Sequence, residues 1–175
     1  MRLTAYTDFT LRMLMYLALR PERSATVGEI AGAYGISVAH LNKVVQQSAL
    51  AGEIETARGR NGGIRLAKPP EAINLAAVVR RTEPDMDLAP CFADRGVCVL
   101  GRCCLLEAAL RRASKAFLDE LRRTTLADLI GPGGPSVRLF SPAAIRRSGT
   151  PRKQALAGAT GRRALAGAGR RCADA

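Results

Sequence analysis

Hydrophobic residues recur along the first twenty positions with the spacing of an α-helix, and they cover more than one face of it. Thr7 and Asp8 are residue types that commonly open a helix, and Pro21 follows the expected end near Arg20. A helix that is apolar most of the way round is buried on several sides, often by a partner subunit. The apolar positions of this predicted helix are Phe9, Leu11, Met13, Leu14, Met15 and Leu17.

Two further amphipathic helices follow, joined by a tight turn. Thr26 and Glu29 have the spacing of a capping box, in which each side chain bonds to the backbone amide of the other residue. Gly35 suits the left-handed residue that ends such a helix, and Ser37 can cap the next one. Two helices joined by a short glycine-containing turn are typical of a helix-turn-helix.

The second of these helices has an apolar side and a polar side. The pattern predicts an inward set of Val38, Leu41, Val44, Val45 and Ser48. It predicts an outward set of Ala39, His40, Asn42, Lys43, Gln46 and Gln47. In a helix-turn-helix the second helix enters the major groove, so the outward set is the expected DNA-reading surface.

Two segments of alternating residues around a glycine-rich turn predict a β-hairpin. Ile54 and Thr56 alternate with polar neighbours before the turn, and Ile64 and Leu66 resume the alternation after it. The expected tip carries arginines and no acid, the arginines being Arg58, Arg60 and Arg65. A helix-turn-helix followed by a basic hairpin predicts a mainly α fold, the winged helix-turn-helix with a small β-hairpin wing.

The pattern from there to residue 130 is helical. A helix that begins at Pro70 is expected to bury Ile73, Leu75, Ala76, Val78 and Val79. A long helix from about Cys104 to Arg123 has an apolar stripe at three- and four-residue spacing, formed by Leu106, Leu110, Ala113, Phe117 and Leu121. No other predicted helix is long enough to cover this stripe, so its expected partner is the same helix of a second copy. A short helix within 124–130 closes the fold.

Charge is distributed unevenly along the 175 residues. The formal net charge of +12 indicates a polyanionic partner, but residues 131–175 hold nine basic residues against one acid. That stretch also contains eight glycines and four prolines, and it is expected to be disordered. The predicted organisation is a DNA-binding domain (1–83), a cysteine-rich cluster loop (84–104), a dimerisation helix with a closing helix (105–130) and a disordered basic tail (131–175).

The start of the chain lacks the layout of a signal peptide, and its most apolar run is short and contains arginines. These features predict a cytoplasmic protein without a membrane partner, in a reducing compartment where structural disulfides are rare. A membrane-surface or RNA-binding module that uses the basic tail is the rival class.

Nucleic-acid contacts are expected from the helix-turn-helix and the wing. Asn42 and Gln46 can pair with adenine edges, and Lys43 can reach guanine or phosphate. The wing arginines suit phosphate or a narrow minor groove. His40 considered alone would be a solvated surface residue, and only its place in the first turn of the helix favours a contact. The predicted set is Thr26, Ser37, His40, Asn42, Lys43, Gln46, Arg58, Arg60, Asn61, Gly62 and Arg65.

Four of the five cysteines fall within residues 90–104, in a polar segment rich in loop-forming residues. Six residues separate Cys91 from Cys98 and five separate Cys98 from Cys104, which Cys103 directly precedes. The C-x-x-C pairs typical of structural zinc are lacking. Three widely spaced thiolates on a loop favour an iron–sulfur cluster, with zinc or a thiol–disulfide switch as alternatives. Cys172, in the tail, is expected to be uninvolved.

Several of these motifs together resemble a known family. The segments MRLTAYTDFTLRMLMYLA, ISVAHLNKVVQQ and RGRNGGIRLA, then the cysteine loop and the long helix, are similar to the Rrf2 superfamily of winged-helix regulators over about residues 1–130. Within it, the chain most resembles repressors that sense nitric oxide. The resemblance implies a homodimer on an inverted-repeat DNA operator, not an enzyme, released when nitric oxide attacks its iron–sulfur cluster. A [4Fe-4S] cluster is favoured over [2Fe-2S], and a sensor of iron–sulfur supply or redox state is the alternative.

The resemblance also implies which residues hold the cluster. Three cysteines match Cys91, Cys98 and Cys104, with Cys103 as the alternative to the last. An N-terminal aspartate of the partner subunit supplies the fourth ligand in the family, and Asp8 matches it in the TDxxxR motif. Relatives that regulate cluster assembly instead use a histidine three residues after the third cysteine, where this chain has Glu107. The purely structural role for Asp8 is an ion pair at the start of the first helix.

Overall fold

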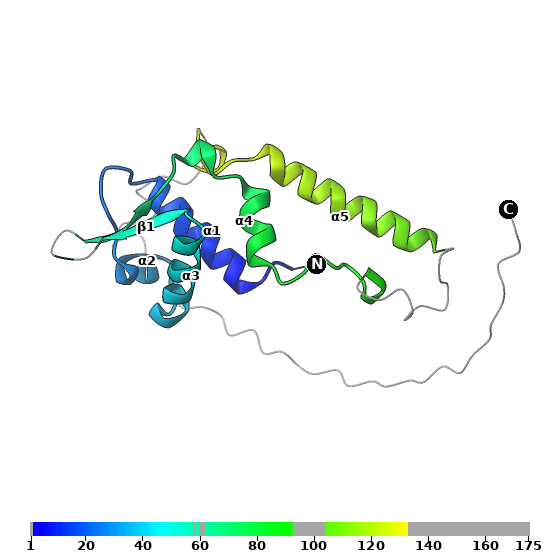
Figure 1. The fold of residues 1–175 in the computed structure, drawn as a ribbon, viewed down its shortest axis with the longest axis horizontal. Helices are drawn as coiled ribbons and strands as arrows, with labels where there is room; N and C mark the ends of the chain where they lie inside the picture. Colours follow the sequence, from blue (N-terminus) through cyan, green and yellow to red (C-terminus); the bar gives the residue numbers. More distant parts are fainter. Residues whose placement is uncertain (1, 58, 60–61, 93–103, 133–175) are drawn as a thin grey trace, which may run out of the picture.

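The computed structural model describes residues 2–57, 59, 62–92 and 104–132. The predictions for the tail from residue 133 and for the following residues lie outside it: Arg58, Arg60, Asn61, Cys98, Cys103 and Cys172. Figure 1 shows helices α1 to α6 and one antiparallel hairpin, β1–β2. The fold is mainly α with a small two-stranded sheet, as the sequence pattern predicted. In the described part of the chain, no helix is both long and apolar enough to cross a bilayer.

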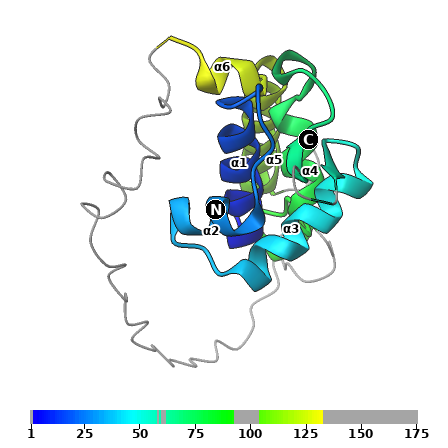
Figure 2. The ribbon, with the colours of Figure 1, turned by 90° about the vertical axis from the view of Figure 1, so that its left-hand side faces the viewer.

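Helix α1 (Ala5–Ala18) forms the centre of the helical body. It packs against α3, α4 and α6, and Figure 2 shows α6 beside one end of it and α2 and α3 toward the other. Met13, Leu14 and Leu17 are buried, so packing within the same chain accounts for the apolar character of the helix on several sides. The helix begins earlier than expected, because Thr4 rather than Thr7 caps it, and Thr7 lies buried inside it.

Helices α2 (Val27–Tyr34) and α3 (Val38–Leu50) form the predicted helix-turn-helix. Thr26 and Glu29 form the capping box, Gly35 has a positive φ of 66°, and the Ser37 hydroxyl caps α3. Leu41, Val44 and Ser48 are fully buried, and every residue of the predicted outward set is exposed. The prediction for Val38 is wrong: at the very start of the helix it lies beyond the edge of the core and is 50% exposed.

The wing consists of β1 (Ile54–Ala57) and β2 (Gly63–Leu66), paired in antiparallel register from Ile54 opposite Leu66 to Ala57 opposite Gly63. Ile64 is buried and forms a β-bridge with Ala25, in the loop before α2. Only glycine fits at position 63, because an added Cβ would lie 2.9 Å from the carbonyl oxygen of Ala25. The wing is therefore fixed at its base to the start of the helix-turn-helix.

The segment after the wing differs from the single Pro-led helix that the sequence predicted. Pro70–Ala72 forms a short 3-10 turn, η1, and helix α4 (Leu75–Thr82) starts afresh with Asn74 as its cap. The predicted apolar contacts Ile73, Leu75, Ala76, Val78 and Val79 are all buried. At the end of α4 the Arg81 guanidinium lies 2.6 Å from the Glu53 carboxylate, which joins α4 to the segment between α3 and the wing.

A second 3-10 turn, η2 (Pro90–Phe92), is followed in the described chain by the long helix α5 (Leu105–Arg123) and the short helix α6 (Leu126–Ile130). The end of α5 is anchored to the body, because the Asn74 amide donates to the Arg122 carbonyl at 2.7 Å. From there α5 extends away along its length (Figure 1). None of its residues is buried, and the residues of its predicted stripe are exposed or half-buried.

Candidate nucleic-acid interface and metal centre

The exposed face of α3 is the first component of the candidate site. Asn42, Lys43 and Gln46 are all exposed, as predicted, and Ala39 lies among them. The helix contains no acidic residue, so nothing on it repels a phosphate backbone. Side chains with both donors and acceptors on a cationic helix face suit the edges of base pairs.

His40 lies on a different edge of the same helix. Its ring stacks on that of Phe9 in α1, with 6.2 Å between centroids and 28° between planes. The imidazole is exposed, but this contact directs it toward α1. His40 therefore connects the first helix with the first turn of the DNA-facing helix, a contact that the sequence pattern did not show.

Two predicted DNA contacts are capping residues. The Thr26 hydroxyl accepts the Glu29 N–H at 3.1 Å, and the Ser37 hydroxyl accepts the His40 N–H at 3.2 Å. The Thr26 N–H bonds to the Glu29 carboxylate and, with Arg23, lowers the pKa of Glu29. A hydroxyl that accepts one bond can still donate another, and both residues are exposed at helix starts, where a phosphate is favoured.

The described part of the wing contains an acid, Glu55, beside one of its basic residues. Arg65 donates to the Glu55 carboxylate at 2.6 Å, directly across the hairpin. Of the three arginines assigned to an acid-free tip, Arg65 therefore has an acid beside it, because Glu55 faces it in the register of the sheet. Gly62 closes the turn by donating its N–H to the Gly59 carbonyl at 2.9 Å.

Arg23 is a candidate that the sequence analysis missed. It is exposed in the loop before α2 and lines a hollow shared with Gly62 and Arg65. Its guanidinium donates to the Glu29 carboxylate at 3.0 Å. The β-bridge between the wing and Ala25 brings these segments together, and a single basic residue in a polar loop gives no signal of that pairing.

Two of the predicted cysteine ligands lie in the described chain. Cys91 belongs to η2 and Cys104 is the cap of α5, and both are half-buried free thiols. The Cys104 sulfur accepts the Glu107 N–H at 3.4 Å. The sulfur therefore takes the position of a helix cap at the start of α5.

Phe92 and Arg111 connect the two cysteine positions. The Arg111 guanidinium lies 4.3 Å from the centre of the Phe92 ring, and it also donates to the Glu107 carboxylate at 2.8 Å. This clamp fixes η2 against the first two turns of α5. Among the described residues, no three His, Cys, Asp or Glu side chains converge as a metal site. Of the four proposed ligands only Cys91, Cys104 and Asp8 are described, the last being expected from a second copy.

Asp8 lies in the first turns of α1 and is 44% exposed. It accepts a bond from Arg12 at 2.8 Å, as its structural role predicted. It lines an open hollow with Arg2, Phe9 and Leu11, so its carboxylate is accessible from outside the subunit.

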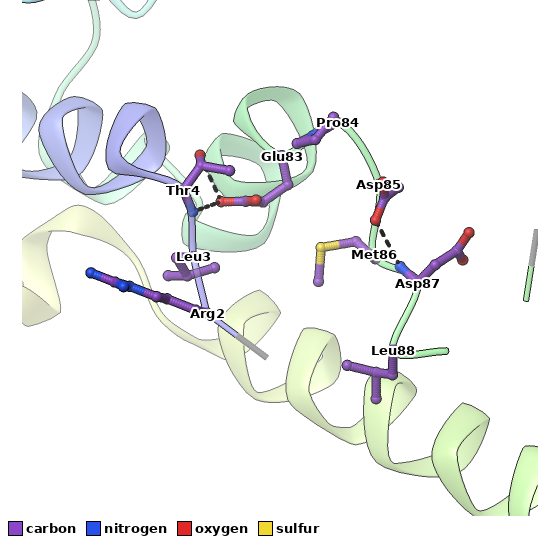
Figure 3. A pocket seen from close by; sticks show the side chains of 9 residues that line it. All are labelled: Arg2, Leu3, Thr4, Glu83, Pro84, Asp85, Met86, Asp87 and Leu88. Carbon is purple, nitrogen blue, oxygen red and sulfur yellow. Dashed lines mark hydrogen bonds between the residues drawn. The ribbon is translucent and has the colours of Figure 1, made fainter. Parts of the chain in front are cut away.

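A neighbouring pocket separates the start of the chain from the linker that leads to Cys91 (Figure 3). On one wall the Glu83 carboxylate accepts the Thr4 N–H at 2.9 Å, and it also accepts the hydroxyl of Thr7. Asp85 accepts the N–H of Asp87 on the opposite wall. The cap of α1 is thereby bonded to the residue that follows α4, where the linker to the cysteines begins.

Comparison with known proteins assigns the described chain to a family. Residues 3–132 match the family model Rrf2, described as an iron-dependent transcriptional regulator. The chain is 50% identical to the HTH-type transcriptional regulator NsrR of Geobacillus kaustophilus, over 74% of this chain and 90% of that protein. It is 47% identical to NsrR of Halalkalibacterium halodurans with the same coverage, and 45% identical to NsrR of Bacillus subtilis.

Solved structures agree with this assignment at the level of the fold. A transcriptional regulator of Listeria innocua matches with a TM-score of 0.64 and 25% identity, covering 78% of this chain and 91% of the other. IscR of T. potens matches with a TM-score of 0.60 and 20% identity, covering 74% and 86%. The expectation of a regulator rather than an enzyme is confirmed by these relatives, and the chain belongs to the Rrf2 family of winged-helix transcriptional regulators.

Proposed function

We propose that the chain is a homodimeric repressor that binds an inverted-repeat DNA operator and senses nitric oxide through an iron–sulfur cluster. The observation that supports it most is the pair of half-buried free thiols, Cys91 in η2 and Cys104 at the start of α5, two elements that the Phe92–Arg111 contact joins. Relatives called NsrR at 45–50% identity support this function. As a regulator of transcription it would act in the cytoplasm, beside the chromosome.

The donor set fits an iron–sulfur cluster. Cys91, Cys98 and Cys104 would each supply a thiolate, the ligand that such clusters require, and Asp8 of the partner subunit would supply an oxygen. Three cysteines and one aspartate would give each iron of a [4Fe-4S] cluster one protein ligand, and [2Fe-2S] is the alternative. When bound, the cluster supplies iron that reacts with nitric oxide, most readily where its protein ligand is a weakly held carboxylate.

The second copy would pair along α5. Leu105 is 86% exposed and Leu106 is 65% exposed, in a helix of nineteen residues that buries none of them within the subunit. Two such helices side by side would cover these side chains and bring the apolar stripes together. Ligation by Asp8 would also require the first turns of one α1 to lie beside the cysteines of the other subunit.

DNA binding would use one recognition helix from each subunit. A symmetric dimer places its two α3 helices in successive major grooves on one side of the duplex, so the operator is expected to be an inverted repeat. The spacing between the two helices then determines affinity, and any change in the position of α1 relative to its neighbours alters that spacing.

Anaerobic purification tests the proposal. The wild-type protein should contain iron and sulfide in equal amounts, and it should bind a palindromic duplex selected from a random pool. Cys91→Ser should lose the iron and the sulfide while remaining folded, because a hydroxyl is a far weaker ligand for iron than a thiolate. Wild-type protein that takes up zinc instead, or no metal at all, would contradict the cluster assignment.

A further inference from the structure

Val38 is an apolar side chain in an unexpected place. It is one of four large hydrophobic residues that are exposed in the described chain. Two of the others, Leu105 and Leu106, begin the helix proposed to form the dimer, and the third, Leu50, ends α3. Val38 instead occupies the first position of α3, directly after its cap Ser37. In a helix-turn-helix, this end of the second helix is the one that enters the major groove.

The neighbours of Val38 on α3 belong to the helix face that is proposed to contact DNA. Asn42 follows one turn later on the same side of the helix, and Ala39 and Lys43 form the adjacent pair with the same spacing. All four are exposed. His40 points elsewhere, because it stacks on Phe9. The face therefore changes from apolar in its first turn to polar in its second.

We propose that Val38 contacts the 5-methyl group of a thymine in the major groove of the operator. This inference rests on the proposed DNA-binding function and adds a determinant of base choice. Among the four base pairs, only those containing thymine present a methyl group in the major groove, and apolar side chains are its complement. A β-branched valine is stiff about χ1, so little side-chain freedom is lost on contact. Asn42 would bond to the edge of an adjacent base pair.

Uracil substitution isolates this contact, because it removes the methyl group and leaves every hydrogen-bonding group of the base in place. The probe is a duplex enriched from a random pool by the full-length wild-type protein, kept free of oxygen. Each symmetric pair of thymines is then replaced by uracil in turn. At one symmetric pair of thymines, the affinity of the protein for the duplex should fall by about fourfold for each methyl group removed. Replacing both thymines of that pair should lower it by about fifteenfold.

Three variants assign the effect to the side chain. Val38→Ala and Val38→Ser, which lose both γ-methyl groups, should bind the thymine and uracil duplexes almost equally at that position. Leu50→Ala removes an exposed apolar side chain from the other end of the same helix, and it should retain the full preference for thymine. A preference that persists in Val38→Ala, or that is found at no position, overturns the assignment while DNA binding stands. If the wild-type protein enriches no duplex, both this inference and the proposed function fail.

Discussion

The ring of Phe9 in α1 stacks on the imidazole of His40 in the recognition helix, with 6.2 Å between their centroids. Phe9 directly follows Asp8, the residue proposed to reach the cluster of the partner subunit. His40 lies in the first turn of α3, beside the residues proposed to contact bases. Because the two rings stack, we expect a displacement of the first turns of α1 to act on the recognition helix through this pair.

Replacing Asp8 tests whether it is more than the ion-pair partner of Arg12. Asp8→Ala should still assemble a cluster on three cysteines but change its absorption spectrum and its rate of reaction with nitric oxide, measured by stopped flow. Arg12→Ala is the matched control, since it breaks the same exposed pair and keeps the carboxylate. That pair should contribute at most about 1 kcal/mol to stability. Identical spectra and rates in all three proteins would leave Asp8 with a structural role alone.

Glu55 is predicted to weaken DNA binding by neutralising Arg65 in the wing. Glu55→Gln should raise operator affinity about two- to fivefold and steepen its salt dependence by up to about one ion, because Arg65 becomes free to pair with phosphate. Glu71→Gln removes an equal charge from an exposed site on η1 and serves as the control. Equal gains in the two variants would mean that overall charge, rather than Arg65, is responsible.

Breaking the pair between Arg81 and Glu53 should destabilise the domain. The two side chains are 26% and 11% exposed, so removing the guanidinium leaves a carboxylate largely shielded from water. Arg81→Ala is expected to lower the free energy of unfolding by about 2 kcal/mol, less than for a fully buried pair. Arg80→Ala, at the exposed neighbouring position, should change it by at most about 0.5 kcal/mol. Urea denaturation of the two variants measures these changes. Equal urea midpoints of unfolding in Arg81→Ala and Arg80→Ala would contradict a stabilising ion pair.

Local signals in the sequence were sufficient for much of the fold. The capping box at Thr26, the stop at Gly35 and the cap at Ser37 each depend on residues a few positions apart, and all three were predicted correctly. The start of α1 was missed because Thr4 and Thr7 are equally good caps by type. In the structure the Thr4 hydroxyl accepts the Thr7 N–H, and both hydroxyls bond to Glu83, a tertiary contact that residue type does not reveal.

The candidate site was less predictable, because its geometry depends on contacts between residues that are far apart in the sequence. The pattern of α3 gave the direction of its buried face but not how far the core extends along it, so Val38 was assigned to the wrong side. The contact between Phe9 and His40 and the pair of Glu55 with Arg65 depend on helix packing and strand register. The residue types at these positions indicate neither the helix packing nor the strand register.

Comparing two neighbouring cysteines tests the third thiolate. Cys104→Ser should lose the cluster but keep its fold, because serine is a good helix cap and can replace the Cys104 sulfur that accepts the Glu107 N–H. Cys103→Ser should retain the cluster and serves as the control. Iron and sulfide content together with far-ultraviolet circular dichroism separate loss of ligand from loss of structure. A Cys104→Ser protein with full iron content would move the ligand to Cys103.

The most direct test of nitric-oxide sensing measures the state of the cluster and the binding of the operator in the same anaerobic sample. Nitric oxide is added stepwise to the wild-type protein bound to a fluorescent operator duplex, while cluster absorbance and fluorescence anisotropy are recorded together. We predict that anisotropy falls to the value of free DNA over the same additions that bleach the cluster, and that Cys91→Ser shows neither change. An operator that stays bound after the cluster has reacted would contradict this prediction.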